Sequence, residues 1–224
     1  MIKIENIDVY GFESAIRGMR NPLNSWDRMD SYFTDHGTSV GENDLDLMQR
    51  LFKGGTEHRK YLRFIDVTMD ITAPLYWWKE FDTYKVGTVA NSCSTMHKIH
   101  AKEFTIDDFS HEHLVKPSLY SLMHTIDILN YYKDLFVNGE ELEPACQDPT
   151  TRLEVHCMTK KDAWNQMIQL LPTSYNQKRT VKFNYEVAVR IIEQRKGHKL
   201  DEWHELVNVL IDLPYMKQIT RMGE

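Results

Sequence analysis

The amino-acid sequence predicts a single α+β domain over residues 1–224. Segment 65–72 alternates strictly between apolar and polar residues, which is the pattern of a half-buried strand. The second half of the chain repeats apolar residues at helical spacing. No internal repeat, low-complexity tract or Pro/Ser-rich linker separates these parts, and 224 residues are enough for one domain with a sizeable core.

The first half of the chain is predicted to contain strands and short helices in alternation. Apolar residues near 2–9 indicate an opening strand, and residues 13–19 begin a helix that Pro22 ends. A second helix is capped by Asn43 or Asp44 and stops at Gly54-Gly55. The strand of 65–72 follows, is broken by Ala73-Pro74, and leads into a helix over 75–85 and a polar loop from Gly87.

The second half is predicted to be mostly helical. A helix after Pro117-Ser118 carries an apolar stripe and ends at Asn138-Gly139. Segment 139–153 holds two prolines and is predicted to be a loop. Further helices are predicted over the ranges 158–171, 176–195 and 200–212, each stopped by a following proline or glycine.

Charge and cysteine content exclude several classes of protein. The 33 acidic residues outnumber the 27 basic ones, so we expect no nucleic-acid polymer as a partner, because such proteins need a basic surface. Cys93, Cys146 and Cys157 show no CxxC spacing and no disulfide framework. No apolar run approaches the roughly 18 residues of a membrane helix, and the N-terminus does not resemble a signal peptide. The composition therefore predicts a soluble cytoplasmic globular protein without a membrane partner.

The chain has no complete motif for a metal or a common nucleotide site. His97 and His100, and His111 and His113, are pairs that could chelate a metal only if a third ligand converged on them, and no HExxH is present. We therefore predict no metal. GxSxG, GxGxxG and GxxxxGK[ST] are also missing. Trp77 and Trp78 are predicted to be helix core, although charged residues follow them directly in a way that suits a planar heterocyclic ligand.

A series of short motifs lies in a defined order and spacing along nearly the whole chain. It consists of Ser14-Ala15-Ile16-Arg17-Gly18-Met19-Arg20, Leu47-Met48, Gly54-Gly55, His58, the alternating strand, Ala73-Pro74, Leu170-Leu171-Pro172, Asn184 and Arg195. In this order the motifs resemble the flavin-dependent thymidylate synthases, the ThyX family. The resemblance implies a ThyX-like single domain with a mixed or antiparallel sheet and a mostly helical C-terminal half. It is least supported between about 100 and 157.

The chain departs from the family at its defining run, RHRxxSxNxxSxR. Thr83, Tyr84 and Lys85 stand where the family has Arg-His-Arg, and Thr88 stands at the first serine. With one inserted residue, Asn91 and Ser94 match the asparagine and second serine and Met96 takes the place of the last arginine; without it, Cys93 takes the serine position. Ile168 or Gln169 replaces another arginine. Because arginine grips phosphate with two parallel hydrogen bonds and lysine does not, phosphate recognition is weakened or rebuilt.

The resemblance implies an FAD-dependent methyltransferase of nucleotide biosynthesis. Such enzymes reduce FAD with NADPH and move a one-carbon unit from methylenetetrahydrofolate to C5 of dUMP, giving dTMP, in sites shared between the subunits of a homotetramer. The substrate is a pyrimidine deoxynucleotide monophosphate. The catalytic residues implied here are Ser94 and Arg195. The residues implied to bind the nucleotide are Glu80, Asn91, Ser92, Cys93, Ser94 and Arg195. Those implied to bind the flavin are His58, Thr83, Tyr84, Lys85 and Asn184, with Tyr84 able to stack on a ring.

Two alternatives stay open at this stage. The substituted phosphate-binding positions also fit a related flavoenzyme that acts on another pyrimidine such as dCMP, or that adds hydroxymethyl in place of methyl. Loss of Arg-His-Arg equally fits a degenerate homologue that binds flavin or nucleotide without turnover.

Overall fold

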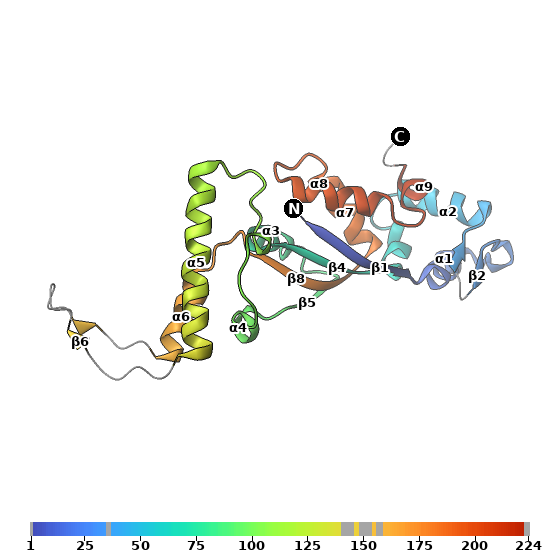
Figure 1. Cartoon of the computed structure of the whole chain (residues 1–224). Coiled ribbons are helices and arrows are strands. Elements are labelled where there is room, and N and C mark those ends of the chain that lie inside the picture. Colours follow the sequence, from blue (N-terminus) through green and yellow to red (C-terminus); the bar gives the residue numbers. More distant parts are fainter. Residues whose placement is uncertain (1, 35–36, 140–145, 148–153, 156–158, 222–224) are drawn as a thin grey trace. The chain divides into compact units, whose positions relative to one another are not determined.

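The computed structural model of the chain describes residues 2–34, 37–139, 146–147, 154–155 and 159–221 (Figure 1). The α+β class predicted from the sequence is confirmed. Contacts divide the chain into two compact units. The sheet unit comprises Met1–Thr72, Lys79–Asn91 and Lys178–Glu224, and the helical unit comprises Ala73–Trp78 and Ser92–Gln177. The prediction of one domain over 1–224 stays a prediction.

The sheet unit contains most of the strands. Its strands and helices are β1 Lys3–Tyr10, α1 Phe12–Arg20, β2 Tyr32–Thr34, β3 Gly37–Ser39, α2 Glu42–Lys53, β4 Asp66–Pro74, β5 Thr88–Ser92, β8 Asn176–Asn184, α7 Tyr185–Arg195, α8 Asp201–Ile211 and α9 Met216–Thr220. The ends of β4, β5 and β8 extend into the helical unit. Short 3-10 helices lie at η1 Asn21–Leu23, η2 Trp26–Arg28 and η3 Arg59–Phe64.

The central sheet has the strand order β1-β4-β8-β5. β1 and β4 pair antiparallel, with a register shift between Glu5 and Asp8. Ion pairs Lys182–Asp66 (3.0 Å) and Lys178–Asp70 (2.9 Å) show that β8 also runs antiparallel to β4. The predicted alternation of β4 is confirmed, because the side chains it buries are Ile65 just before the strand and Val67, Met69 and Ile71 within it.

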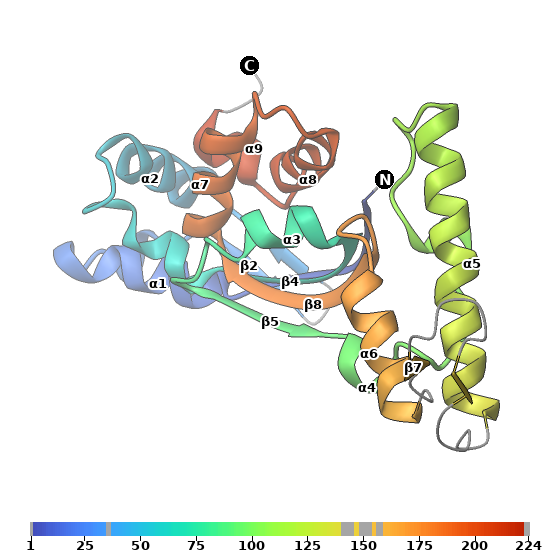
Figure 2. The same ribbon diagram turned by 90° about the vertical axis from the view of Figure 1, so that its left-hand side faces the viewer.

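Helices α7 and α8 lie over one face of this sheet (Figure 2). Val181 and Phe183 of β8 point into the core, which α7 and α8 close with fully or nearly fully buried side chains. Each buried Val, Ile, Leu or Phe side chain stabilises the fold by about 1.5–3 kcal/mol relative to its exposed state. The helix side chains in this core are Val187, Ala188, Val189, Ile191, Ile192, Leu206, Val207 and Leu210.

Several predicted boundaries are wrong. The single helix expected over 176–195 is strand β8 followed by helix α7, and the junction is Asn184, whose side chain accepts a hydrogen bond from the Val187 N–H. The segment after Gly87 is strand β5 and not a loop. The helix after Pro74, α3 Leu75–Phe81, ends before the predicted residue 85. Helix α2 begins at Glu42, so Asp44 is a buried residue within the helix and not its cap.

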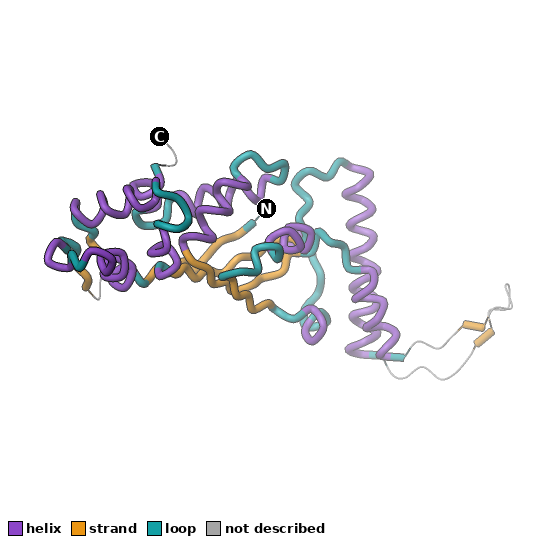
Figure 3. Tube along the Cα trace, turned by 180° about the vertical axis from the view of Figure 1, so that it is seen from behind, coloured by secondary structure: helices purple, strands orange, loops and turns teal. Residues whose placement is uncertain are grey.

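The helical unit is built around one long helix, α5 Lys116–Asn138, and the shorter α6 Lys160–Leu170 that packs beside it (Figure 3). The stripe predicted for α5 is confirmed by the burial of Leu122, Ile126 and Leu129, which pack with Ile99, Phe104, Phe109 and Met167. The remaining elements of this unit are residues 75–78 of α3, α4 Thr95–Lys98, η4 Ile106–Asp108, β6 Cys146–Gln147 and β7 Glu154–Val155. Trp77 and Trp78 are fully buried, as predicted.

The described part of the chain contains no helix that is both long and apolar enough to cross a membrane.

Candidate functional site

Five side chains of the sheet unit form a polar and aromatic cluster at the C-terminal end of α7. We call it the Arg195 cluster, and it consists of Glu80, Tyr84, Arg195, His198 and Trp203. Three of its members, Glu80, Tyr84 and Arg195, are residues for which the family resemblance implies a role in binding. The structure therefore brings together residues that are 115 positions apart in sequence.

The Glu80 carboxylate is the centre of this cluster. Its Oε2 atom lies 2.7 Å from Arg195 Nη1, 3.1 Å from Trp203 Nε1 and 3.3 Å from His198 Nε2. His198 Nδ1 accepts a hydrogen bond from the Leu200 N–H at 3.2 Å. In the neutral ring this places the remaining proton on Nε2, the nitrogen that lies 3.3 Å from the Glu80 carboxylate.

Arg195 is held in place by contacts other than Glu80. Its Nε donates to the Tyr84 hydroxyl at 3.0 Å, and that hydroxyl donates to Gln194 Oε1 at 3.0 Å. Its guanidinium lies 4.4 Å from the centre of the Trp203 ring, and the Trp203 ring is stacked on Phe81. The guanidinium also lies 5.7 Å from the centre of the Tyr84 ring, so its positive charge is held in a defined orientation against two aromatic rings.

Tyr84 is itself a core residue in this arrangement. Only 3% of it is exposed, and its ring contacts Phe81 and Trp203 while the guanidinium of Arg190 lies 5.4 Å above it. The part of Tyr84 that serves the cluster is its hydroxyl.

The other residues implied to bind flavin lie apart from these contacts. Thr83 and Lys85 are exposed, and the Thr83 hydroxyl donates to the backbone carbonyl of Glu80. Asn184 caps α7 and faces Gly87, where an added Cβ would come within 3.3 Å of Asn184 Nδ2. Gly87 has a φ of 82°, which also favours glycine.

His58 lines a cavity of about 730 Å³ in the sheet unit. Of the five residues implied to bind the cofactor, all of which the structure describes, His58 is the one that lines this cavity. Four cationic side chains also reach its wall, namely Arg20, Arg28, Arg50 and Lys60. Three acidic residues, Asp27, Asp46 and Glu57, line the cavity too, and their negative charge partly balances that of the cations.

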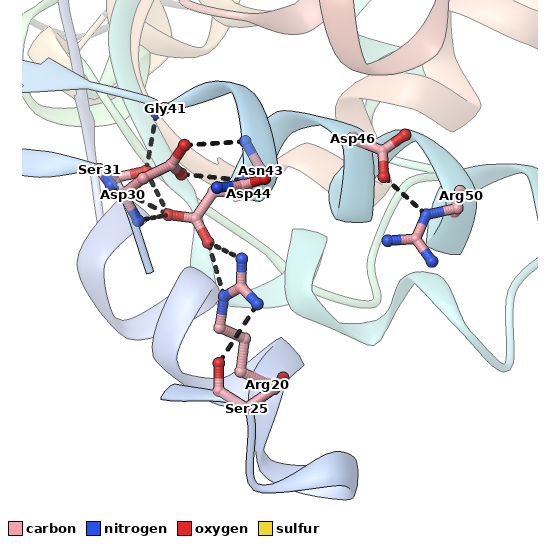
Figure 4. Close-up of polar contacts among 9 residues, drawn as sticks. All are labelled: Arg20, Ser25, Asp30, Ser31, Gly41, Asn43, Asp44, Asp46 and Arg50. Atoms are coloured by element: carbon pink, nitrogen blue, oxygen red, sulfur yellow. Dashed lines mark hydrogen bonds and ion pairs between the residues drawn. The ribbon is translucent and has the colours of Figure 1, made fainter. Parts of the chain in front are cut away.

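One wall of the cavity is fixed by the buried ion pair of Arg20 and Asp44 (Figure 4). Arg20 Nε and Nη2 each lie 2.7 Å from Asp44 Oδ1, while the other carboxylate oxygen, Oδ2, accepts from the backbone of Asp30 and from the backbone and hydroxyl of Ser31. Burial would raise the pKa of Asp30, but backbone hydrogen bonds from Asn43 and Asp44 outweigh it and lower that pKa. Asp30 thereby performs the capping role predicted for Asn43 or Asp44.

The residues implied to bind the nucleotide in segment 91–94 are accessible. Asn91, Ser92 and Cys93 are exposed, and Ser94 caps α4 by accepting a hydrogen bond from the His97 N–H at 3.2 Å. The Cys93 carbonyl accepts from Gln177 Nε2 at 2.8 Å. Asn91 belongs to the sheet unit and the other three to the helical unit, so Ser94 and Arg195, the two implied catalytic residues, lie in different units.

The sequence analysis missed His198 and Trp203 as members of the site. A signal existed, because both follow Arg195 within eight residues and carry N–H donors. The histidine pairs His97/His100 and His111/His113 do not form a ligand set. Among the described residues, no three side chains of His, Cys, Asp or Glu gather as a metal site requires.

The sequence matches no protein-family model and no curated protein. The structure, in contrast, has the fold of a flavin-dependent thymidylate synthase. A crystal structure of thymidylate synthase X from Helicobacter pylori with FAD and dUMP is similar over 98% of this chain and 97% of that chain, with a TM-score of 0.62 and 14% identity. A second structure of the Helicobacter pylori enzyme, also with FAD and dUMP, covers 96% of this chain and 97% of its own, with a TM-score of 0.60 and 14% identity.

Proposed function

We propose that this chain is a divergent ThyX enzyme that uses FAD to transfer a one-carbon unit to C5 of a pyrimidine deoxynucleotide, converting dUMP to dTMP. The observation that carries the proposal is the structural likeness to thymidylate synthase X over nearly the whole length of both chains. The Arg195 cluster adds support from the site, because Arg195, Tyr84 and Glu80 come together although the surrounding motif has changed.

The cavity lined by His58 supports the binding of FAD. Its volume of about 730 Å³ lies within the range of small-molecule sites. A dinucleotide brings a pyrophosphate, and Arg28, Arg50 and Lys60 supply cations at the wall. Thr83, Lys85 and Asn184 complete the flavin site in this proposal, with residues contributed by neighbouring subunits of a homotetramer.

The residues of this chain act by binding and by placing charge. Arg195, oriented by the Tyr84 hydroxyl and the Trp203 ring, faces the nucleotide and binds its negative charge. Asn91, Ser92, Cys93 and Ser94 bind the nucleotide from their exposed segment, and Ser94 carries the second catalytic group. FAD, reduced by NADPH, supplies the redox chemistry, with methylenetetrahydrofolate as the one-carbon donor.

An absorption spectrum of the purified protein tests this proposal first. We expect a yellow protein, or one that turns yellow with added FAD, whose flavin bands bleach with dithionite. The bleached protein is then incubated with methylenetetrahydrofolate and either dUMP or dCMP. Product from dUMP supports the proposal, whereas labelled product from dCMP alone would move the assignment to the other pyrimidine. Mass analysis of the product separates methyl from hydroxymethyl.

One observation favours a second candidate, a homologue that binds flavin or nucleotide without turnover. Arg195 is engaged by Glu80 at 2.7 Å, and Thr83 stands at the first arginine position of the family motif. Nucleotide binding without any product from either nucleotide would favour this candidate. The predicted cytoplasmic location stays a prediction.

A further inference from the structure

Three N–H donors converge on a single oxygen atom in the Arg195 cluster. Arg195, His198 and Trp203 approach Glu80 Oε2 to 2.7, 3.3 and 3.1 Å. One guanidinium and two ring N–H groups around one carboxylate oxygen form the kind of arrangement by which proteins bind phosphate and carboxylate groups.

The donors are oriented independently of the carboxylate that they bind. Arg195 is fixed by the Tyr84 hydroxyl and the Trp203 ring, and His198 is fixed by the Leu200 N–H. Trp203 is fully buried and stacked on Phe81. If Glu80 moved away, these groups would therefore still point at the same place, as a preorganised site requires.

Glu80 is the most exposed partner in this contact. Its side chain is 37% exposed, against 17% for Arg195 and 23% for His198. It also lies in the last turn of α3, where the helix dipole disfavours a negative charge. The carboxylate can therefore swing toward solvent while its three donors stay in place.

We propose that Glu80 is an internal ligand of an oxyanion site formed by Arg195, His198 and Trp203, and that an external phosphate or carboxylate group binds there by displacing it. The inference deepens the proposed function. It rests on that function only where it identifies the bound anion as the phosphate of a nucleotide. Glu80 then sets how strongly the protein binds an anionic ligand. The three donors would also explain how a phosphate can still be bound although the arginines of the family motif are replaced in this chain.

The test compares the affinities of wild-type protein and Glu80→Gln for three probes, namely inorganic phosphate, dUMP and deoxyuridine. Glutamine keeps the size of the side chain and removes its charge. Asp82→Asn is the matched control, because Asp82 lies two residues away and pairs with Arg179 outside the cluster. The Trp203 indole N–H resonance, assigned with Trp203→Phe, reports on the site without any need for flavin or turnover.

We expect Glu80→Gln to bind phosphate and dUMP about tenfold or more tightly than wild type, the scale of a charged hydrogen bond. Deoxyuridine affinity should not change, Asp82→Asn should resemble wild type, and the gain should vanish in Glu80→Gln/Arg195→Met. The indole N–H should shift when phosphate is added to Glu80→Gln. A gain for phosphate but not dUMP would still support the site and identify free phosphate as its ligand.

Unchanged or weaker phosphate binding by Glu80→Gln would overturn the inference. So would a gain that survives the Arg195→Met change, or an equal gain in Asp82→Asn, since either would reflect overall charge alone. Should Glu80→Gln fail to fold, Glu80→Asp retracts the carboxylate by one methylene and is expected to give a smaller gain of the same sign. A protein that binds no FAD yet shows these gains would remove the proposed function and leave the oxyanion site standing.

Discussion

Two arginine–carboxylate pairs of the sheet unit have the same length and opposite surroundings. Arg20 and Asp44 lie 2.7 Å apart and are 4% and 0% exposed, whereas Arg195 and Glu80 also lie 2.7 Å apart but are 17% and 37% exposed. Asp44 has further hydrogen-bond partners in Asp30 and Ser31, whereas the Glu80 side chain stays partly exposed to solvent. The comparison teaches that an ion-pair distance alone does not separate a structural pair from one that a ligand can open.

Breaking the buried pair should have the largest effect on stability. Asp44→Asn leaves the Arg20 guanidinium buried without its counter-charge, which costs about 3–5 kcal/mol of the free energy of unfolding. Urea denaturation measures this loss. The control is Asp46→Asn in the same helix, whose exposed pair with Arg50 contributes only about 0.3–0.5 kcal/mol. Equal losses in the two variants would contradict a structural role for Arg20–Asp44.

Breaking the partly exposed pair of Arg195 and Glu80 should reduce binding more than stability. We expect Arg195→Ala to weaken dUMP binding by about 1.5–3 kcal/mol, because a charged hydrogen-bond donor is lost. Calorimetric titration gives the affinity, and the same sample gives the unfolding free energy. Arg179→Ala serves as the control, since Arg179 is similarly exposed and pairs with Asp82. Wild-type affinity in Arg195→Ala would mean that the nucleotide does not reach this cluster.

The smallest effect is expected from a half-buried carboxylate of the sheet, Asp70. Hydrogen bonds from Thr180, Lys178 and Asn6 lower the pKa of Asp70 to about 2. Because the folded-state pKa lies below its usual value of 3.8, this contribution is present above about pH 4 and is lost as the pH falls toward 2. The unfolding free energy of wild type should therefore fall more steeply over that interval than that of Asp70→Asn. Thr180→Val should fall between them, and parallel curves for all three would contradict the assignment.

Local patterns in the sequence were enough to predict much of the fold. The alternation of 65–71 and the stripe of α5 gave the correct elements, because each buries one face of a regular structure. Residues 176–184 were assigned to a helix because their strand pattern is short and mixed with charged residues. Their strand conformation depends on pairing in the sheet with β4, whose sequence lies about a hundred residues earlier.

The site was predictable only in part for a similar reason. Resemblance to a family pointed to Glu80, Tyr84 and Arg195, which the fold brings together. It could not reveal that Glu80 forms an ion pair with Arg195, nor that His198 and Trp203 approach the same carboxylate oxygen. These contacts depend on how α3, α7 and α8 pack. The sequence likewise did not reveal that Asp44 is the buried partner of Arg20, since an aspartate near the start of a helix is usually its N-cap.

Titration of the purified protein with FAD tests the central claim most directly. The account predicts saturable binding that quenches flavin fluorescence and yields a yellow protein bleached by dithionite, with weaker binding when His58 is replaced by alanine. A protein that remains colourless at saturating FAD, with the fold intact by circular dichroism, would contradict it.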